Sequence, residues 1–271
     1  MLEILKNRAI IQISGADAQK FLQILTTNDV INQQYTYNYL LNNQGRYLFD
    51  FFVYQKTSDN YFIDVSNVSS ANLIKLFSLY KLRSDVTIKD VSTIYNIIYS
   101  KNILKDAEFS DIDPRYKNLG FRSMILKEKN IEFDNGEENL YLIDKYNNAI
   151  IDGEDDLIKD KSIPIEYGAD DLNAIDYKKG CYIGQEVISR AKYQGVIRKK
   201  IYKLEFAQAN PEIKQGSEIL DLNDDKIGYV CSNRDRIAIV IIREEKYLGL
   251  ERKKAIVNNS PADIIIPSWR N

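Results

Sequence analysis

The stretch KKGCYIGQE at residues 178–186 sets one cysteine, Cys181, between two glycines, Gly180 and Gly184. The pattern of residues 185–192 predicts a helix directly after it. Backbone amides at the start of a helix and the two preceding lysines favour a thiolate, so Cys181 is a candidate nucleophile or soft-metal ligand. The flanking glycines permit a tight turn or a close approach of the backbone to a ligand. An equally simple interpretation is a strand–helix junction in which Cys181 is a small buried residue.

The absence of histidine narrows the chemistry that this cysteine can support. None of the 271 residues is a histidine, which excludes a Ser-His-Asp triad, a Cys-His pair and histidine-ligated zinc or iron. The second cysteine, Cys231, lies in an apolar run at 227–231 and is predicted to pack in the core. A metal at Cys181 would need further ligands from another protein or from glutathione, because one thiol cannot fill a four-ligand site.

Charge and hydropathy disfavour several kinds of partner. The 37 Lys and Arg residues nearly balance 39 Asp and Glu residues, a net charge of −2, which disfavours direct nucleic-acid binding. The dense basic stretch from Arg190 to Lys200 most simply forms a solvated face, although it could meet an anionic tail or a phosphate backbone. The longest apolar run, 237–242, is too short to span a membrane, and the first residues lack a signal-peptide pattern. With only two cysteines, the chain is expected in a reducing compartment, either the cytoplasm or the equivalent in an organelle after import, and we predict the cytoplasm.

Hydropathy patterns predict an α+β fold. Runs typical of strands lie at 9–13, 35–41, 47–54, 61–65, 86–99 and 121–126, and a turn that ends at Gly45 joins the second and third as a hairpin. Amphipathic stripes predict one helix that begins at Ser14 as its N-cap and a second over 69–80. After residue 200, short strands at 202–206, 219–222, 227–231, 237–242 and 255–257 predict a small antiparallel barrel or sandwich.

The cysteine motif and four further stretches resemble one known family. Residues 179–186, together with Arg190, are similar to the signature of the YgfZ family of folate-binding proteins, which are relatives of the glycine-cleavage T protein, an aminomethyltransferase. Residues 15–30 resemble the family's N-terminal segment, and residues 40–50 resemble its central hairpin. Residues 113–122 and 195–199 are most similar to the subgroup that contains the mitochondrial iron–sulfur assembly factor.

This resemblance implies an α+β fold of three modules around a central folate pocket, ending in a small C-terminal antiparallel β-barrel. The folate-binding core would comprise residues 1–95 together with 160–198. Residues 96–159 would form an α/β module inserted in this core, and residues 199–271 would form the barrel. The resemblance also implies tetrahydrofolate or a derivative as cofactor, and a role in maturing or repairing four-iron four-sulfur proteins. The implied partners are an A-type iron–sulfur scaffold protein, with which a transient cluster would be shared, and iron–sulfur client enzymes.

The candidate site residues come from the matching segments and from polar residues near turns. Cys181 is expected to act as a thiolate, either as a nucleophile or as one ligand of a shared cluster. Asp50 is the second candidate catalytic residue. The expected folate contacts are Asn28, Asp29, Tyr47, Asp50, Lys179, Gly180, Tyr182, Gly184, Gln185, Glu186 and Arg190.

Two other functions stay open at this point. T proteins resemble the hairpin but carry two adjacent acidic residues where this chain has Phe49 and Asp50, and they lack the cysteine of the motif. This departure disfavours aminomethyl transfer, yet Asp50 keeps a tetrahydrofolate-dependent one-carbon transferase as an alternative. A factor in tRNA modification is a third interpretation, because bacterial relatives of the family are linked to that process.

Overall fold

The computed structural model of the protein describes residues 1–129, 139–195 and 197–270. Its first half contains a five-stranded antiparallel sheet with the order β3-β4-β5-β2-β6. The strands are β2 (Arg8–Ser14), β3 (Tyr35–Leu41), β4 (Tyr47–Thr57), β5 (Asn60–Ser66) and β6 (Thr87–Asp90). Helices α1 (Ala18–Leu25) and α2 (Asn67–Tyr80) share an apolar core with this sheet, in which the Phe21 and Phe77 rings meet edge to face. The predicted strands, hairpin and second helix are confirmed.

The first helix begins later than its sequence predicts. Ser14 is the last residue of β2, and α1 begins at Ala18 with Asp17 in the N-cap position, so the prediction of Ser14 as N-cap is wrong. Gly15, between them, has a φ of +131°, and a Cβ atom there would lie 2.2 Å from the Asp85 carbonyl oxygen. The close approach of the chain near Asp85 therefore sets where the helix begins.

A second sheet joins the first residues of the chain to its middle. Its order is β1-β7-β9-β8, with β1 (Leu2–Ile4), β7 (Tyr95–Ser100), β8 (Phe109–Ile112) and β9 (Phe121–Leu126). The strand-rich region 86–99 thus divides between two sheets. Because β1 pairs with β7, the chain's first residues complete a sheet of the middle segment. The division into the three proposed modules stays a prediction.

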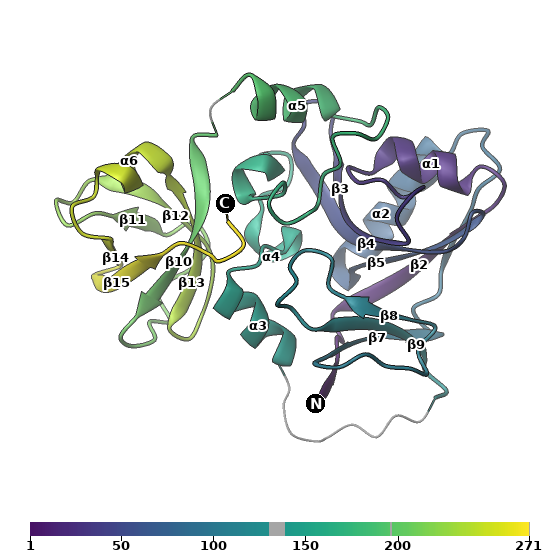
Figure 1. Ribbon diagram of the computed structural model, residues 1–271, viewed down its shortest axis with the longest axis horizontal. Coiled ribbons are helices and arrows are strands. Elements are labelled where there is room, and N and C mark those ends of the chain that lie inside the picture. The colour runs from purple at the N-terminus through teal and green to yellow at the C-terminus, as the bar shows by residue number, and fades with distance from the viewer. Residues whose placement is uncertain (130–138, 196, 271) are drawn as a thin grey trace.

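The C-terminal segment forms a closed antiparallel barrel with the order β10-β13-β12-β11-β14-β15 (Figure 1). This confirms the predicted barrel. Its strands are β10 (Lys199–Phe206), β11 (Glu218–Leu220), β12 (Lys226–Arg234), β13 (Ile237–Arg243), β14 (Lys254–Val257) and β15 (Ser260–Ile265), with α6 (Glu244–Gly249) after β13. Sequence patterns did not predict β15, which begins Ser-Pro.

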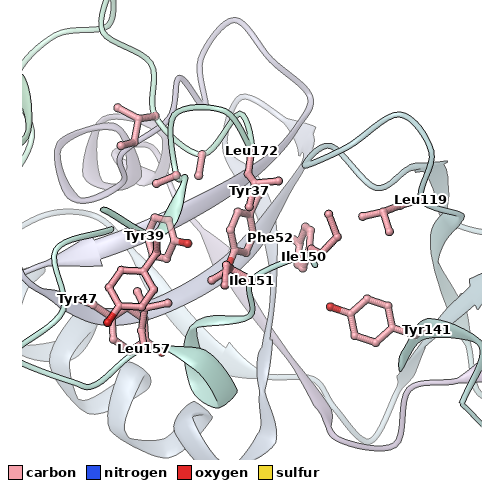
Figure 2. Packing of buried hydrophobic residues seen from close by; sticks show 14 of the residues in the cluster. Tyr37, Tyr39, Tyr47, Phe52, Leu119, Tyr141, Ile150, Ile151, Leu157 and Leu172 are labelled. Atoms are coloured by element: carbon pink, nitrogen blue, oxygen red, sulfur yellow. The ribbon is translucent and has the colours of Figure 1, made fainter. Parts of the chain in front are cut away.

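The centre of the molecule, between the barrel and the two sheets, is filled by side chains. Helix α3 (Leu140–Asn148) and the short α4 (Gly153–Asp156) lie in this region, and α5 (Gln185–Tyr193) lies at its edge, at the top of the view (Figure 1). The 3-10 helix η1 (Pro164–Tyr167) contributes the buried Tyr167 to the same core. Figure 2 shows Tyr37, Tyr39 and Tyr47 of the large sheet gathered with Ile151 and Leu157, which flank α4. Helix α4 contacts β4 on one side and β12 on the other, so it connects the large sheet to the barrel.

Candidate functional site

The thiol of Cys181 lies on the surface, in the loop just before α5. Cys181 is a free, exposed cysteine, so its interpretation as a small buried residue is wrong. Helix α5 begins at Gln185, as predicted. Cys231, on strand β12, is buried in the central core, as predicted for a core residue, and burial raises the pKa of its thiol well above the usual range. Cys181 is thus the accessible thiol of this chain.

The two glycines of the motif have different surroundings. Gly184 has a φ of +82°, and a Cβ atom there would lie 2.7 Å from the Asn42 carbonyl oxygen and 3.0 Å from the Gly45 Cα. Gly45, at the hairpin turn, also has a positive φ, +69°. The hairpin and the cysteine motif therefore meet backbone to backbone, which only glycine permits. A Cβ atom on Gly180 would have no atom of the described residues within 4 Å.

Lys179 ties the cysteine loop to the end of α1. Its buried Nζ donates hydrogen bonds to the carbonyl oxygens of Gln23 (2.7 Å), Thr26 (2.6 Å) and Asn28 (2.7 Å). Burial lowers the pKa of the Lys179 ammonium to about 8, which keeps it mostly charged at neutral pH. Its three protons are all used, so Lys179 has none left for a ligand or for the exposed thiol. The Tyr182 ring is also buried and lies 5.4 Å from this Nζ.

Asn28 and Asp29 shape the loop after α1. The Asn28 amide nitrogen donates to the carbonyl oxygen of Asn173 at 2.7 Å, which joins this loop to a segment far along the chain. Burial would raise the pKa of Asp29, but hydrogen bonds from the Asn32 side chain and from the amides of Ile31 and Asn32 lower it. Both side chains are therefore bonded inside the protein.

Asp50 is buried, with only 5% of its surface exposed. Its two carboxylate oxygens accept hydrogen bonds from the hydroxyls of Tyr37 (2.8 Å) and Tyr47 (3.0 Å). Helix α4 begins directly against it, since a Cβ atom on Gly153 would lie 2.2 Å from Asp50 Oδ1. Asp50 faces the interior and Cys181 faces solvent, so the two candidate catalytic residues do not share one surface.

The first turns of α5 face solvent, and its basic residues are paired. Glu186 and Arg190 form an exposed ion pair one turn apart. Further along the basic stretch, ion pairs join Lys192 to Asp170, Lys199 to Glu166 and Lys200 to Glu244. Val196, in this stretch, lies outside the described residues. This local neutralisation fits a solvated face better than a surface for an anionic polymer.

A cavity of about 530 Å³ opens beside the cysteine loop. Of the predicted folate contacts only Asn28 lines it, together with Gln33, Tyr35, Thr36, Pro114, Asn173, Ile175, Asp176, Tyr177, Lys178 and Tyr193. The hydroxyls of Tyr35 and Tyr177 are buried and have no hydrogen-bond partner among the described residues. Sequence analysis missed these tyrosines because 19 tyrosines in the chain make any single one uninformative.

Two kinds of similarity connect this arrangement to known proteins. Residues 6–101 match the family described as the GCVT N-terminal domain. The fold is similar to that of the glycine cleavage system aminomethyltransferase T from Bartonella henselae, with a TM-score of 0.73 and 12% identity over 98% of this chain and 84% of that one. The iron–sulfur cluster assembly factor IBA57 homologue of Pyricularia oryzae is 31% identical over 73% of this chain, and that of Mycosarcoma maydis is 30% identical over 74%. The chain is therefore similar to GcvT-like proteins in the sequence of its first third and in its fold.

The similarity to the IBA57 homologues extends over about three quarters of this chain. The chain spans 55% and 56% of the length of the Pyricularia oryzae and Mycosarcoma maydis proteins. Both of these relatives, and a third from Dictyostelium discoideum, are named as mitochondrial proteins. These names contradict the prediction of a cytoplasmic location, which is therefore wrong. That prediction rested on cysteine usage and on the first residues alone.

A buried network of charges, which sequence analysis also missed, stabilises the centre of this GcvT-like chain. Asp64 binds Arg8 and Arg122, each at 2.5 Å. Arg115, fully buried, contacts Asp113 at 2.7 Å and Asp152 at 2.6 Å. Burial would raise the pKa of Asp64 and of Asp152, but the neighbouring cations outweigh it and lower both. Arg115 and Arg122 lie in the segment 113–122 that resembles the family, which was the available signal.

The described residues also show two features that this part of the chain lacks. No three acidic or cysteine side chains among them are grouped so as to hold a metal ion. In the same residues, no helix is both long and apolar enough to cross a membrane.

Proposed function

We propose that this chain is a folate-binding factor that assists iron–sulfur cluster assembly through the thiol of Cys181. The observation that carries the proposal is an exposed free cysteine on a loop fixed on both sides, by Lys179 before it and by the Gly184 turn after it. The names of its IBA57 relatives support the assembly role. The GcvT-like fold supports folate binding.

A cluster at Cys181 would be cargo shared with a partner. One exposed thiol offers a single ligand, and the described residues supply no further group of ligands around it. A fixed loop holds the sulfur in place without closing the site, so the other ligands can come from a second protein. We take this partner to be an A-type scaffold protein, and the recipients to be four-iron four-sulfur client enzymes.

The cavity beside the cysteine loop fits folate in its chemistry. Its walls contain the aromatic rings of Tyr35, Tyr177 and Tyr193, which suit a flat pteridine, and Lys178 offers a charge for an anionic glutamate tail. The unpartnered hydroxyls of Tyr35 and Tyr177 can bond a ligand's polar edge. When bound, tetrahydrofolate supplies a reduced ring that can carry a one-carbon unit. Tyr37 lies two residues from Tyr35 along β3 and donates a hydrogen bond to Asp50. Asp50, Tyr47 and Tyr182 therefore stay candidates for contacts with a part of the ligand that enters further into the protein.

The assembly role is tested in cells depleted of this protein. Activity of an aconitase-type four-iron four-sulfur enzyme is measured after rescue with the wild-type chain, Cys181→Ala or Cys231→Ala. We expect rescue by wild type and by Cys231→Ala, because the Cys231 thiol is buried in the central core and a partner cannot reach it. Rescue by Cys181→Ala would remove the thiol from the function, and no fall in activity on depletion would refute the assembly role.

Folate binding is tested by calorimetry with tetrahydrofolate and the variants Tyr35→Phe and Tyr177→Phe. Each variant keeps the ring and removes only an unpartnered buried hydroxyl, so the free protein should be as stable as wild type or slightly more stable. Affinity should fall by about 1 kcal/mol for each lost hydrogen bond, roughly fivefold. Equal affinity of both variants and wild type would place the ligand elsewhere.

One-carbon transfer stays the second candidate, because Asp50 is a buried carboxylate held by two tyrosine hydroxyls. Product formation from an aminomethyl or methyl donor that survives Cys181→Ala and disappears with Asp50→Asn would favour it. The close packing of Gly153 on Asp50 disfavours it, since a substrate has to reach the carboxylate.

A further inference from the structure

A groove of about 700 Å³ runs along the outer side of α1, next to the cysteine loop. Its lining comes from α1 and from the turn that follows α2: Asp17, Lys20, Phe21, Ile24, Leu82, Arg83 and Ser84. None of these residues belongs to the folate cavity or to the buried charge network.

Ile24 connects this groove to the loop that carries Cys181. The Ile183 amide donates a hydrogen bond of 3.3 Å to the Ile24 carbonyl oxygen, while the Ile24 side chain lines the groove and is half exposed. Lys179 is fixed to the same end of α1. The residues two positions before and two positions after Cys181 are thus both bonded to the end of α1, the helix that forms one wall of the groove.

Leu82 has a conformation that the fold alone does not explain. Its side chain is 84% exposed, and its φ of +44° is in the left-handed region. A left-handed conformation costs a leucine on the order of 1–2 kcal/mol, and an exposed apolar side chain recovers none of it. Backbone strain of this kind clusters at functional sites, and here the strained residue places its apolar side chain beside the groove. Gly15 makes room for this turn, because any Cβ there would strike the Asp85 carbonyl.

The charges of the groove select one kind of occupant. Lys20 and Arg83 are exposed, and neither is paired with a carboxylate in the described residues. Asp17 also lines the groove and accepts a hydrogen bond from the Asp85 amide at 2.8 Å, so the lining carries two cations against one carboxylate. The groove therefore presents the exposed apolar side chains of Ile24 and Leu82, with the buried Phe21 beneath them, together with two free cations.

We propose that this groove is the docking surface for the partner protein that shares a cluster at Cys181, and that the partner places an acidic, apolar segment in it. The proposal rests on the proposed function, because it places the scaffold protein of that function on this chain. Apolar side chains of the segment cover Ile24 and Leu82, and its carboxylates pair with Lys20 and Arg83.

Calorimetry tests the surface, with the A-type scaffold protein titrated into the full chain. The groove variants are Leu82→Asn and Arg83→Glu. The matched controls lie on the barrel: Leu248→Asn, at a leucine that is 69% exposed, and Arg252→Glu, at an exposed arginine. Asparagine tolerates the left-handed region, so Leu82→Asn removes the apolar contact without destabilising the fold. Thermal unfolding should confirm that it is as stable as wild type.

We expect each groove variant to weaken binding about tenfold and each barrel control to change it less than about twofold, because few interface residues carry most of the binding energy. Raising the salt from about 50 to about 300 mM should weaken wild-type binding and leave Arg83→Glu nearly unaffected. Groove variants that bind as wild type would overturn the docking surface and leave the proposed function intact. A wild-type chain that does not bind the scaffold protein would overturn both. A dimer of this chain that Leu82→Asn dissociates, seen by sedimentation, would assign the groove to a second copy and overturn the proposal.

Discussion

The close packing of Gly153 against Asp50 lets us predict how a substitution at the centre of the molecule changes the stability of the protein. A Cβ atom at Gly153 would lie 2.2 Å from Asp50 Oδ1, 2.5 Å from its Cγ and 2.6 Å from a ring carbon of Tyr47. Asp50 cannot turn aside without breaking its hydrogen bonds from Tyr37 and Tyr47. The substitution Gly153→Ala therefore forces α4 away from β4 or breaks at least one of these bonds.

The cost follows from either response. Overpacking a well-packed core costs about 1–3 kcal/mol, and a lost hydrogen bond to a charged group costs about 1.5–3 kcal/mol. We expect Gly153→Ala to lower the free energy of unfolding by about 2–4 kcal/mol. Gly180→Ala is the matched control, because a Cβ atom there meets no described atom within 4 Å and its φ is not in the left-handed region. It should stay within about 0.5 kcal/mol of wild type, as surface substitutions usually do.

Urea denaturation of the two variants and the wild type, followed by circular dichroism, measures these differences. The reasoning is refuted if Gly153→Ala unfolds at the same urea concentration as Gly180→Ala, since Asp50 would then have free space above it. That result would also remove the objection to a transferase, because a substrate could reach the carboxylate.

The remaining predictions concern the buried charges. Arg122→Met removes one of the two cations that pair with Asp64 in the described residues and should destabilise the fold by about 3–5 kcal/mol. Arg252→Met on the barrel surface should change stability by less than about 0.5 kcal/mol, and thermal and urea unfolding of both variants check this. The pKa values of Asp64 and Asp152 are lowered in the folded protein, so their stabilisation is present above the unfolded value of about 4 and is lost as the pH falls below it. Urea unfolding at neutral pH and near pH 3 should show this loss, partly offset by Asp156, whose pKa burial raises; equal stability at both pH values would contradict it.

Patterns local in sequence predicted most of the fold, and contacts distant in sequence explain the rest. Alternation and turn residues gave β4, β9 and most barrel strands, because each is specified by its own side chains. The start of α1 was mispredicted because the approach of Asp85 to Gly15 is invisible locally. Strand β1 was missed because three residues carry no periodic signal and their partner, β7, lies more than ninety residues away.

The candidate site was predictable by residue type only in part. The motif identified Cys181 and Gly184, whose exposure and backbone contacts agree with special roles. Lys179, Asn28 and Asp29 were chosen because they are polar, yet each bonds to the protein itself. A sequence cannot show whether a polar side chain already has a hydrogen-bond partner inside the protein. For this reason Tyr35 and Tyr177, whose hydroxyls have no such partner in the described residues, were not predicted.

One segment joins the two parts of the proposed function. The cavity that we propose for folate is lined in part by Asn173, Ile175, Asp176, Tyr177 and Lys178, and Cys181 follows three residues later. Lys179 and Ile183 fix this segment to α1, so its cavity side and its thiol side cannot move independently. A ligand that fills the cavity would order the segment and reduce the motion of the thiol, without contact between ligand and sulfur. Under the proposed function, folate would therefore affect cluster chemistry at Cys181 through the position of the loop, while Asp50 stays covered by α4.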